Sequence, residues 1–433
     1  MNFRESVKYL YGLGNEVLAM KLGLENIARL LDALGNPQNE YFKVQIAGTN
    51  GKGSTVAFLE SICLAAGIPT GATTSPHLVS VTERVRIAGR DISAKDFARH
   101  ATLVRETSEK LVAAGALETV PTFFEQATAI ALSAFAEAGV ALAILETGLG
   151  GRFDATTAAR AEIVGITPVD YDHQRILGDS LAAIAAEKAA IIRPDTPVVV
   201  APQESEAFAV IAGRCRELKV EPVPVGHEYE FEKTGEGLIA VGFATRSDHY
   251  GGVVPGLPGR HQIVNAKVAV NLAELLRDAG FEIKKQAILT GLETARHRGR
   301  LEYFRGMLFD GAHNAGGARA LRAYLDEFVD RPLTLVFGSM RDKDLTEITA
   351  ELFPRAETIV LTAAANPRSM PAAELINRLP EGLDRERVRV AETVAAALAL
   401  ARRLTPADGL ICVTGSLYLV GEAQKLLAAD DEI

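Results

Sequence analysis

The chain has 433 residues, a net charge of −9 and 48% apolar residues. Ordinary domains hold about 100–200 residues, so this length predicts two or three of them. The acidic balance argues against a general polyanion-binding surface, and no apolar run reaches the roughly 18 residues that span a bilayer. The three cysteines are too widely separated for a disulfide framework. We therefore expect a cytoplasmic protein that acts on small molecules, without nucleic acid or membrane partners.

Strand-like and helix-like segments alternate through the first half of the chain. Short apolar runs predict strands, and longer segments with one apolar face predict helices. The predicted strands are Phe42–Ala47, Thr70–Thr74, Ala141–Glu146 and Ile163–Thr167. The predicted helices are Ser54–Ala66, Glu125–Ala138 and Ser180–Ile192. The stretch Glu228–Ala244 is typical of a hairpin added to this pattern.

The second half repeats the alternation more regularly, after a basic stretch that begins at Thr294. The predicted strands are Met307–Phe309, Leu333–Phe337, Thr358–Leu361, Val388–Val390 and Leu410–Val413. The predicted helices are Ala315–Phe328, Leu345–Leu352, Pro371–Leu379, Glu392–Leu404 and Leu417–Leu427. Such alternation predicts mostly parallel sheets covered by helices on both faces. We place a domain boundary near residue 296.

A glycine-rich loop joins the first strand to the first of these helices. Glycines allow a close approach of the backbone to phosphates, and the free N–H groups of a helix start point at the anion. Its central lysine adds a mobile positive charge, although the loop departs from the strict G-x-x-x-x-G-K-[ST] pattern. The residues predicted to bind ATP here are Thr49, Asn50, Gly51, Lys52, Gly53, Ser54 and Thr55.

The form of this loop, with other motifs in order along the chain, resembles the folylpolyglutamate synthase/dihydrofolate synthase family of the Mur ligase superfamily. The similarity runs from about residue 3 to residue 425. The other matching stretches are Ser75–Leu78 with Glu83 and Arg84, Thr122–Glu125 with Thr128, Glu146–Thr156, Asp172 and His173 with Leu177 and Gly178, Glu187–Ala189, Gly299 and Arg300, and Asp310–Asn314.

The resemblance implies an α/β fold in two parts. A P-loop-type parallel-sheet domain that binds ATP would occupy residues 1–296, and a smaller Rossmann-like ligase domain residues 297–433. It also implies an ATP-dependent carboxylate–amine ligase. ATP would phosphorylate the carboxylate of dihydropteroate or a (poly)glutamylated folate, and the amine of L-glutamate would attack the acyl phosphate. Because that intermediate hydrolyses readily, the site must neutralise phosphate charge and exclude water.

Further nucleotide contacts follow from the resemblance. Asn265 is implied to contact ATP, Arg300 to reach the triphosphate, and Asp310 and His313 to hold the nucleoside. Taken alone, Asn265 could be a surface or cap residue and Arg300 a solvated charge. The run that begins at Asp310 lacks G-x-G-x-x-G, so we do not expect NAD.

Three residues are candidate Mg²⁺ ligands. Glu146 ends a predicted strand near the phosphate loop, where a carboxylate is a natural ligand for Mg²⁺. Ser75 and His173 are assigned as ligands by resemblance only. Taken alone, Ser75 is a turn serine, and His173 is an exposed loop histidine of a type that Mg²⁺ seldom selects.

The resemblance also locates the acceptor substrate and one modification. The implied substrate-binding residues are Thr122, Phe124, Glu125, Phe153, Asp154 and Ala155. Thr82, Thr157 and Tyr171 stand where similar proteins usually carry Asn, Asn and Leu, in each case nearer the acceptor than ATP. Lys188 has mostly Ala and Ile neighbours, which would lower its pKa, and lysines at this place in similar ligases are carbamylated. The catalytic residues are thus predicted to be Lys52, Lys188 and His173.

Two other functions compete with this one. Another Mur-type amide ligase would act on a cell-wall nucleotide precursor, but the 41 residues before the first strand are too few for the extra domain that usually holds it. A regulatory P-loop protein would instead hydrolyse ATP without any need for glutamate. We expect a monomer.

Overall fold

The computed structural model describes residues 1–14, 23–235 and 237–429. It divides into two compact units. The first comprises Met1–Tyr229, Gly242–Val253 and Val264–Ala295, and the second comprises Glu230–Val241, Val254–Ile263 and Arg296–Ile433. Assignment of ligase domains to residues 1–296 and 297–433 stays a prediction.

The first unit is built on an eight-stranded sheet with the order β4-β3-β2-β5-β1-β6-β7-β8. Its strands are β1 (Phe42–Ala47), β2 (Thr70–Thr73), β3 (Val85–Ile87), β4 (Arg90–Asp91), β5 (Leu142–Glu146), β6 (Ile163–Ile166), β7 (Val198–Val200) and β8 (Pro222–Pro224). The pairs from β2 to β8 are parallel, whereas β3 and β4 form an antiparallel edge. The mostly parallel α/β fold predicted from the sequence is confirmed.

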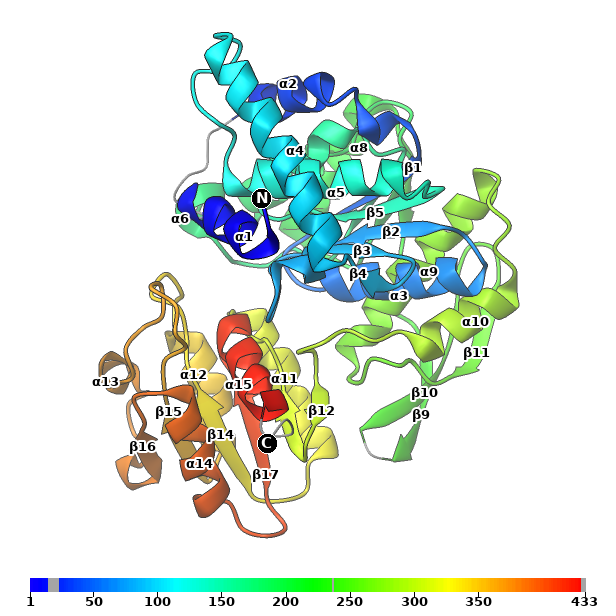
Figure 1. Ribbon diagram of the computed structural model, residues 1–433. Coiled ribbons are helices and arrows are strands. Elements are labelled where there is room, and N and C mark those ends of the chain that lie inside the picture. The colour runs from blue at the N-terminus through cyan, green and yellow to red at the C-terminus, as the bar shows by residue number, and fades with distance from the viewer. Residues whose placement is uncertain (15–22, 236, 430–433) are drawn as a thin grey trace. The chain divides into compact units, whose positions relative to one another are not determined.

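Helices cover both faces of this sheet (Figure 1). One face carries α1 (Phe3–Gly12), α2 (Glu25–Ala33), α4 (Ala94–Ala113) and α5 (Phe123–Glu137), with α7 (Leu181–Ala189) and α8 (Ser205–Leu218) beside them. The other carries α3 (Lys52–Ala65), α9 (His261–Asp278) and α10 (Lys285–Thr294). Gly291 of α10 lies so close to α3 that a Cβ would contact the backbone of Ile62.

The second unit holds a six-stranded sheet with the order β12-β13-β17-β14-β15-β16. Its strands are β12 (Glu302–Phe304), β13 (Met307–Phe309), β14 (Leu333–Phe337), β15 (Thr358–Leu361), β16 (Val388–Val390) and β17 (Leu410–Thr414). The helices are α11 (Ala315–Phe328), α12 (Thr346–Leu352), α13 (Ala372–Leu375), α14 (Val394–Leu404) and α15 (Leu417–Ala429). Side chains of α11, α12 and α13 pack in one apolar core with the sheet.

Element boundaries match the sequence prediction closely, and the largest differences are the early ends of two helices. Helix α7 ends at Ala189 rather than Ile192, and Ser180 is its cap. The predicted helix Pro371–Leu379 is the short α13 followed by a 3₁₀ turn, Ile376–Arg378. The predicted hairpin is present, as β9 (Glu230–Gly235) and β10 (Leu238–Ala244) adjoin β11 (His249–Val253) in a three-stranded sheet.

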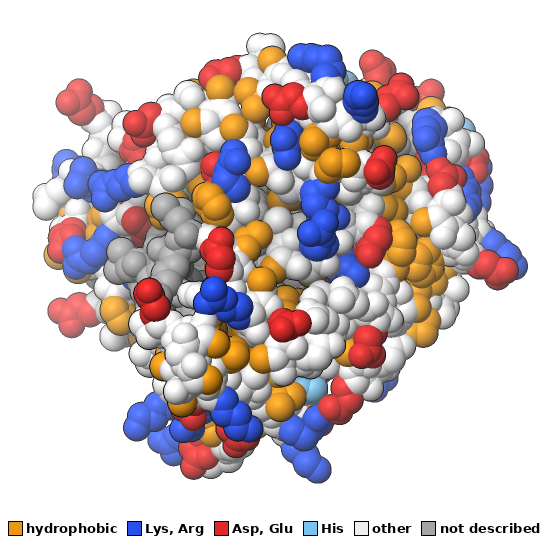
Figure 2. Space-filling model, turned by 90° about the horizontal axis from the view of Figure 1, so that it is seen from above, with side chains coloured by type: hydrophobic (Ala, Val, Ile, Leu, Met, Phe, Trp, Pro, Cys, Tyr) orange, Lys and Arg blue, Asp and Glu red, His pale blue; other side chains and the backbone are white. Residues whose placement is uncertain are grey.

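The structure also bears on surface charge, the cysteines and membrane-spanning helices. Figure 2 shows acidic and basic side chains interspersed over the face that it displays. The three cysteines are buried and free. Among the described residues, no helix has the length and apolar character needed to cross a membrane.

Candidate active site

The phosphate loop lies between β1 and α3, as the sequence predicts. Gly51 caps α3 with a positive φ of 90°, and a Cβ there would overlap the side-chain oxygen of Asn265. Gly48 also has a positive φ, and a Cβ on it would overlap Thr167. Both positions therefore require glycine. Asn265 of α9 lies against the phosphate loop, and both were predicted to bind ATP.

Two lysines converge on the backbone of this loop. Lys52 Nζ donates to the carbonyl oxygens of Gly48 and Thr49, both at 3.1 Å. Lys188 Nζ, from α7, donates to the same Gly48 oxygen at 2.8 Å. Burial, together with the nearby Lys52 cation, lowers the pKa of Lys188 to about 7. A large fraction of Lys188 is therefore a neutral amine near physiological pH.

The loop after β6, which carries His173, is tied to the phosphate loop. The Thr49 hydroxyl donates to the Asp170 carbonyl and accepts from the Asp170 N–H, both at 3.0 Å. His173 has a positive φ of 51°, and its backbone N–H donates to the Asp172 carboxylate at 2.8 Å. The structure thus brings this segment to the carboxyl edge of the sheet, although the sequence alone suggests only an exposed loop.

Two of the three predicted metal ligands are in contact. The buried Glu146 ends β5, and its Oε2 accepts a hydrogen bond from the Ser75 N–H at 3.0 Å. Within residues 1–14, 23–235 and 237–429, no group of three or more His, Cys, Asp or Glu side chains is placed to hold a metal. Mg²⁺ is commonly held by one or two carboxylates with phosphate oxygens and water, so Glu146 and Ser75 fit that donor set.

The loop that bears Ser75 is held rigidly by one carboxylate. Glu83 accepts from the N–H groups of Leu78, Val79 and Ser80 at 2.8–2.9 Å. His77 accepts at Nδ1 from Arg84 and lies 3.0 Å from the Tyr11 hydroxyl through Nε2. Burial and the Arg84 cation lower the pKa of His77 to about 3, so it stays neutral at physiological pH.

The predicted acceptor residues divide into structural and accessible ones. Thr122 and Glu125 cap α5 reciprocally, which commits the Glu125 carboxylate to the helix. Asp154 is buried and accepts from the N–H groups of Gly148, Leu149 and Thr156 at 2.9–3.0 Å and from the Thr156 hydroxyl at 2.5 Å. Because its carboxylate is fully engaged, Asp154 shapes the loop.

Aromatic and apolar groups complete this segment. The Phe124 ring lies against Gly148, where a Cβ would meet it, and Ala155 is buried in the following turn. The Phe153 side chain is 40% exposed, and Tyr171 is 43% exposed. Such exposed aromatic surface at a sheet edge suits a flat apolar ligand.

One buried amide beneath this loop is missing from the sequence prediction. Gln45 Nε2 lies 3.2, 3.0 and 2.8 Å from the hydroxyl oxygens of Thr147, Thr156 and Thr157. The signal available in the sequence is a polar residue inside the apolar strand FKVQIA. Thr157 turns its hydroxyl inward, toward Gln45 and the Gly151 carbonyl.

In the second unit, three predicted ATP residues gather at the end of β13. Asp310 accepts from the N–H groups of Leu301 and Ala312 at 3.0 and 2.9 Å. Burial raises the pKa of Asp310, and the Arg300 cation opposes that shift. His313 Nδ1 donates to the Gly311 carbonyl at 2.7 Å, since a carbonyl oxygen can only accept.

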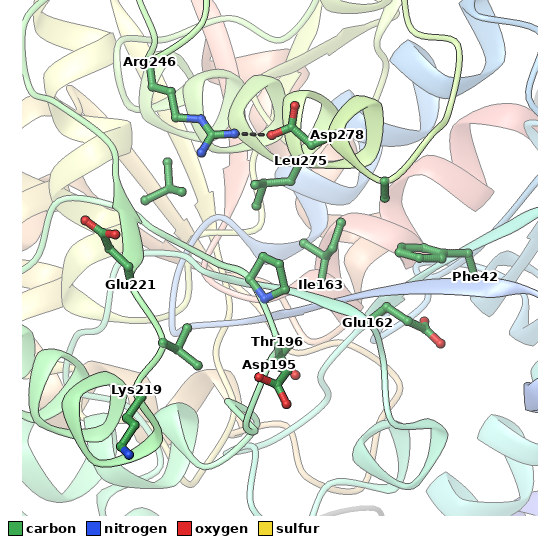
Figure 3. Close-up of a pocket in the computed structure, with 14 residues that line it drawn as sticks. Phe42, Glu162, Ile163, Asp195, Thr196, Lys219, Glu221, Arg246, Leu275 and Asp278 are labelled. Atoms are coloured by element: carbon green, nitrogen blue, oxygen red, sulfur yellow. Dashed lines mark hydrogen bonds and ion pairs between the residues drawn. The ribbon is translucent and has the colours of Figure 1, made fainter.

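A cavity of about 530 Å³ lies at the opposite, amino-terminal edge of the first sheet (Figure 3). Phe42 and Ile163 line it near the starts of β1 and β6, and Arg246 pairs with Asp278 at its side. None of the predicted site residues lines this cavity. Ligands of parallel α/β sheets bind at the carboxyl edge, where the phosphate loop lies.

Taken together, the phosphate loop, the paired lysines and the second α/β unit define a Mur-type ligase. Residues 299–417 match the family model described as Mur ligase, glutamate ligase domain. The chain is 34% identical to a dihydrofolate synthase/folylpolyglutamate synthase of Mycobacterium tuberculosis, over 94% of this chain and 91% of that one. It belongs to the folylpolyglutamate synthase/dihydrofolate synthase family.

Solved structures agree with this assignment. A Mycobacterium tuberculosis folylpolyglutamate synthase complexed with ADP superposes with a TM-score of 0.91 at 31% identity, over 98% of both chains. A bifunctional folylpolyglutamate synthase/dihydrofolate synthase with Mn, AMPPNP and L-glutamate bound gives a TM-score of 0.84 at 28% identity, over 99% of this chain and 98% of that one.

Some similar proteins are much longer than this chain. The chain is 35% identical to a probable bifunctional folylpolyglutamate synthase/dihydropteroate synthase of Haloferax volcanii, matching 98% of this chain. It spans only 50% of that relative's length.

Proposed function

We propose that the protein is an ATP-dependent ligase that adds L-glutamate to dihydropteroate, to a (poly)glutamylated folate, or to both. ATP transfers its γ-phosphoryl group to the acceptor carboxylate with release of ADP. The glutamate amine then attacks the acyl carbon, phosphate leaves, and an amide remains. The convergence of Lys52 and Lys188 on Gly48, beside the Glu146–Ser75 contact, is the observation that carries this proposal.

Lys52 would neutralise the negative charge of the ATP phosphates. The Lys52 ammonium donates to two loop carbonyls, whose oxygens carry only a partial negative charge. A triphosphate offers anionic oxygens instead, so Lys52 would turn to the β- and γ-phosphates. The hydroxyls of Ser54 and Thr55, both buried in the first turn of α3, lie beside the same loop.

Magnesium would be held by Glu146, Ser75 and His173, together with phosphate oxygens. The ion would neutralise phosphate charge and polarise the transferred group. The Ser75 N–H donates to Glu146 Oε2, which helps to orient the carboxylate.

Lys188 would be carbamylated in the active enzyme. Its neutral amine can attack CO₂, form an N–C bond and lose a proton, which converts a cation into an anionic oxygen ligand. Burial favours this reaction because the pKa of about 7 leaves a large fraction of free amine. With His173, the carbamate would support a second metal beside the acyl phosphate.

In the second unit, Arg300 would reach the triphosphate, while Asp310 and His313 would bind the nucleoside. Asn265, beside Gly51, would contact ATP from the first unit. The acceptor would lie along Thr122, Phe124, Phe153 and Ala155. A monomeric state and a cytoplasmic location stay predictions.

The test is product analysis with purified full-length protein. Dihydropteroate and tetrahydrofolate are each incubated with ATP, Mg²⁺ and L-glutamate, and products are identified by mass spectrometry alongside phosphate release. We expect a mass gain of one glutamyl residue with at least one acceptor and no phosphate release without glutamate. Phosphate release independent of glutamate would instead support a regulatory ATPase. Glutamate coupling only to a non-pterin carboxylate would support another Mur-type ligase.

A further inference from the structure

Gln45 occupies a position where one side chain can connect the phosphate loop to the acceptor loop. It is fully buried in β1, three residues before Gly48. Strand β1 pairs with β5 on one side and β6 on the other, and Gln45 lies opposite Leu145 and Val164. The side chain points to the sheet face that α5 and α7 cover, where the segment 147–157 crosses above it.

The hydroxyl groups around Gln45 fix the direction of its amide. Thr156 donates its hydroxyl proton to Asp154, and Thr157 donates its own to the Gly151 carbonyl at 2.8 Å. Both oxygens can therefore only accept from Gln45, which requires the NH₂ group to face them. Among the described residues, Gln45 Oε1 is buried without a hydrogen-bond partner. In this orientation the NH₂ group of Gln45 faces the threonine hydroxyls, and the cost is a buried Oε1 without a hydrogen bond to any described residue.

Each of these threonines belongs to a turn that carries a predicted site residue. Thr147 follows Glu146, and its N–H donates to the Ile46 carbonyl of β1 at 3.0 Å. Thr156 holds Asp154, whose other carboxylate oxygen holds the backbone at Gly148 and Leu149. The same loop rests on α7 through the Arg152–Glu187 ion pair at 2.8 Å, one residue from Lys188.

We propose that Gln45 is a positioning residue that sets the acceptor loop, residues 147–157, against the phosphate-loop strand. Its two N–H protons are shared among three hydroxyl oxygens, so the amide ties the loop to β1. Thr157 is part of this arrangement, because its hydroxyl faces Gln45 and the Gly151 carbonyl. This inference rests on the proposed ligase function, because the loop matters to catalysis only if it presents a carboxylate acceptor to ATP.

Substitution of Gln45 by methionine removes the donor while it keeps an unbranched side chain of similar length. We expect the acceptor KM of Gln45→Met to rise about tenfold, because a misplaced loop costs substrate alignment. KM for ATP should stay within twofold, since the phosphate loop keeps its own contacts to Asp170 and Pro168. Val44→Ala is the matched control, a buried neighbour in the same strand whose loss should lower thermal stability without changing either KM.

Thr157→Val provides a second route to the same contact and avoids a change in the buried strand. It should raise the acceptor KM by a similar factor, and the double variant Gln45→Met/Thr157→Val should add no more than twofold to the larger single effect. An unchanged acceptor KM in both folded variants, or an equal rise in the two KM values, would overturn the proposal. Wild-type product formation is measured first, so failure of the ligase function is separable from failure of the role of Gln45.

Discussion

Lys52 and Lys188 donate hydrogen bonds to the same atom, the carbonyl oxygen of Gly48, at 3.1 and 2.8 Å. Two ammonium groups that share one acceptor repel each other, and this repulsion contributes to the lowered pKa of Lys188. The arrangement places two lysines at the phosphate loop, and the pKa of one of them, Lys188, is lowered to about 7. The two are suited to different tasks, charge neutralisation and covalent capture of CO₂.

Removal of the Lys52 charge tests the phosphate role. We expect Lys52→Ala to lower kcat about a hundredfold or more, equivalent to about 3 kcal/mol of transition-state stabilisation, because one strong electrostatic donor is lost. Thermal unfolding should change little, since the hydrogen bonds from Lys52 Nζ to the Gly48 and Thr49 carbonyls lie within the loop itself. A folded Lys52→Ala protein with near-normal turnover would remove the phosphate-loop interpretation.

The metal assignment predicts a specific change in magnesium dependence. Glu146→Gln keeps the shape of the side chain but removes its charge, so the Mg²⁺ concentration for half-maximal activity should rise at least about tenfold. Glu162→Gln is the control, since this carboxylate pairs with Lys43 at the opposite edge of the sheet. Binding of Mn²⁺ with AMPPNP, followed by electron paramagnetic resonance, should weaken in the first variant only. Equal Mn²⁺ affinity in both would contradict the role of Glu146.

In the second unit, Arg300 should contribute to nucleotide affinity. We expect Arg300→Gln to raise KM for ATP about tenfold, because a guanidinium–phosphate contact is a strong charge-assisted hydrogen bond. Arg319→Gln removes an exposed arginine of the same unit that pairs with Glu347, and it should have no effect on KM. Steady-state kinetics at saturating glutamate compares them. Similar KM values for ATP in wild type and Arg300→Gln would indicate that Arg300 only offsets the negative charge of Asp310.

The fold was largely predictable because strand and helix patterns in this chain are strong and local. Strands β13 to β16 begin and end where the apolar runs do. The helices α1, α2 and α4 lie outside the prediction because no motif singled out their amphipathic surfaces. The antiparallel edge formed by β3 and β4 depends on pairing with β2, which no local pattern reveals.

The location of the candidate site could be predicted from the sequence, but the roles of its individual residues could not. The glycines and the lysine of the phosphate loop can be recognised from the sequence, because their residue types already indicate phosphate binding. By contrast, the hydrogen bonds by which Glu125 caps α5 and Asp154 supports its loop are seen only in the structure. Gln45 has no motif, and its importance emerges only when three threonines distant in sequence meet it.

The carbamate on Lys188 should be detectable spectroscopically, and the unmodified Lys188 amine should make the free energy of unfolding depend on pH. With ¹³C-bicarbonate, the wild-type protein should show a carbamate carbon signal in nuclear magnetic resonance spectra, and Lys188→Met should lack it and lose most activity.

In carbonate-free buffer the pKa of Lys188 in the folded protein, about 7, lies below the ordinary lysine value of 10.5. The unfolded state therefore binds more protons between these values, and the free energy of unfolding should rise with pH from about 7 to about 10.5. Below pH 7 both states are charged and this contribution is constant. Lys188→Met should remove that rise, which urea unfolding at pH 7.0 and 9.5 would measure. Full activity of bicarbonate-replete wild type without a carbamate signal would exclude the modification, whereas an unchanged pH slope in Lys188→Met would show that the amine is not desolvated.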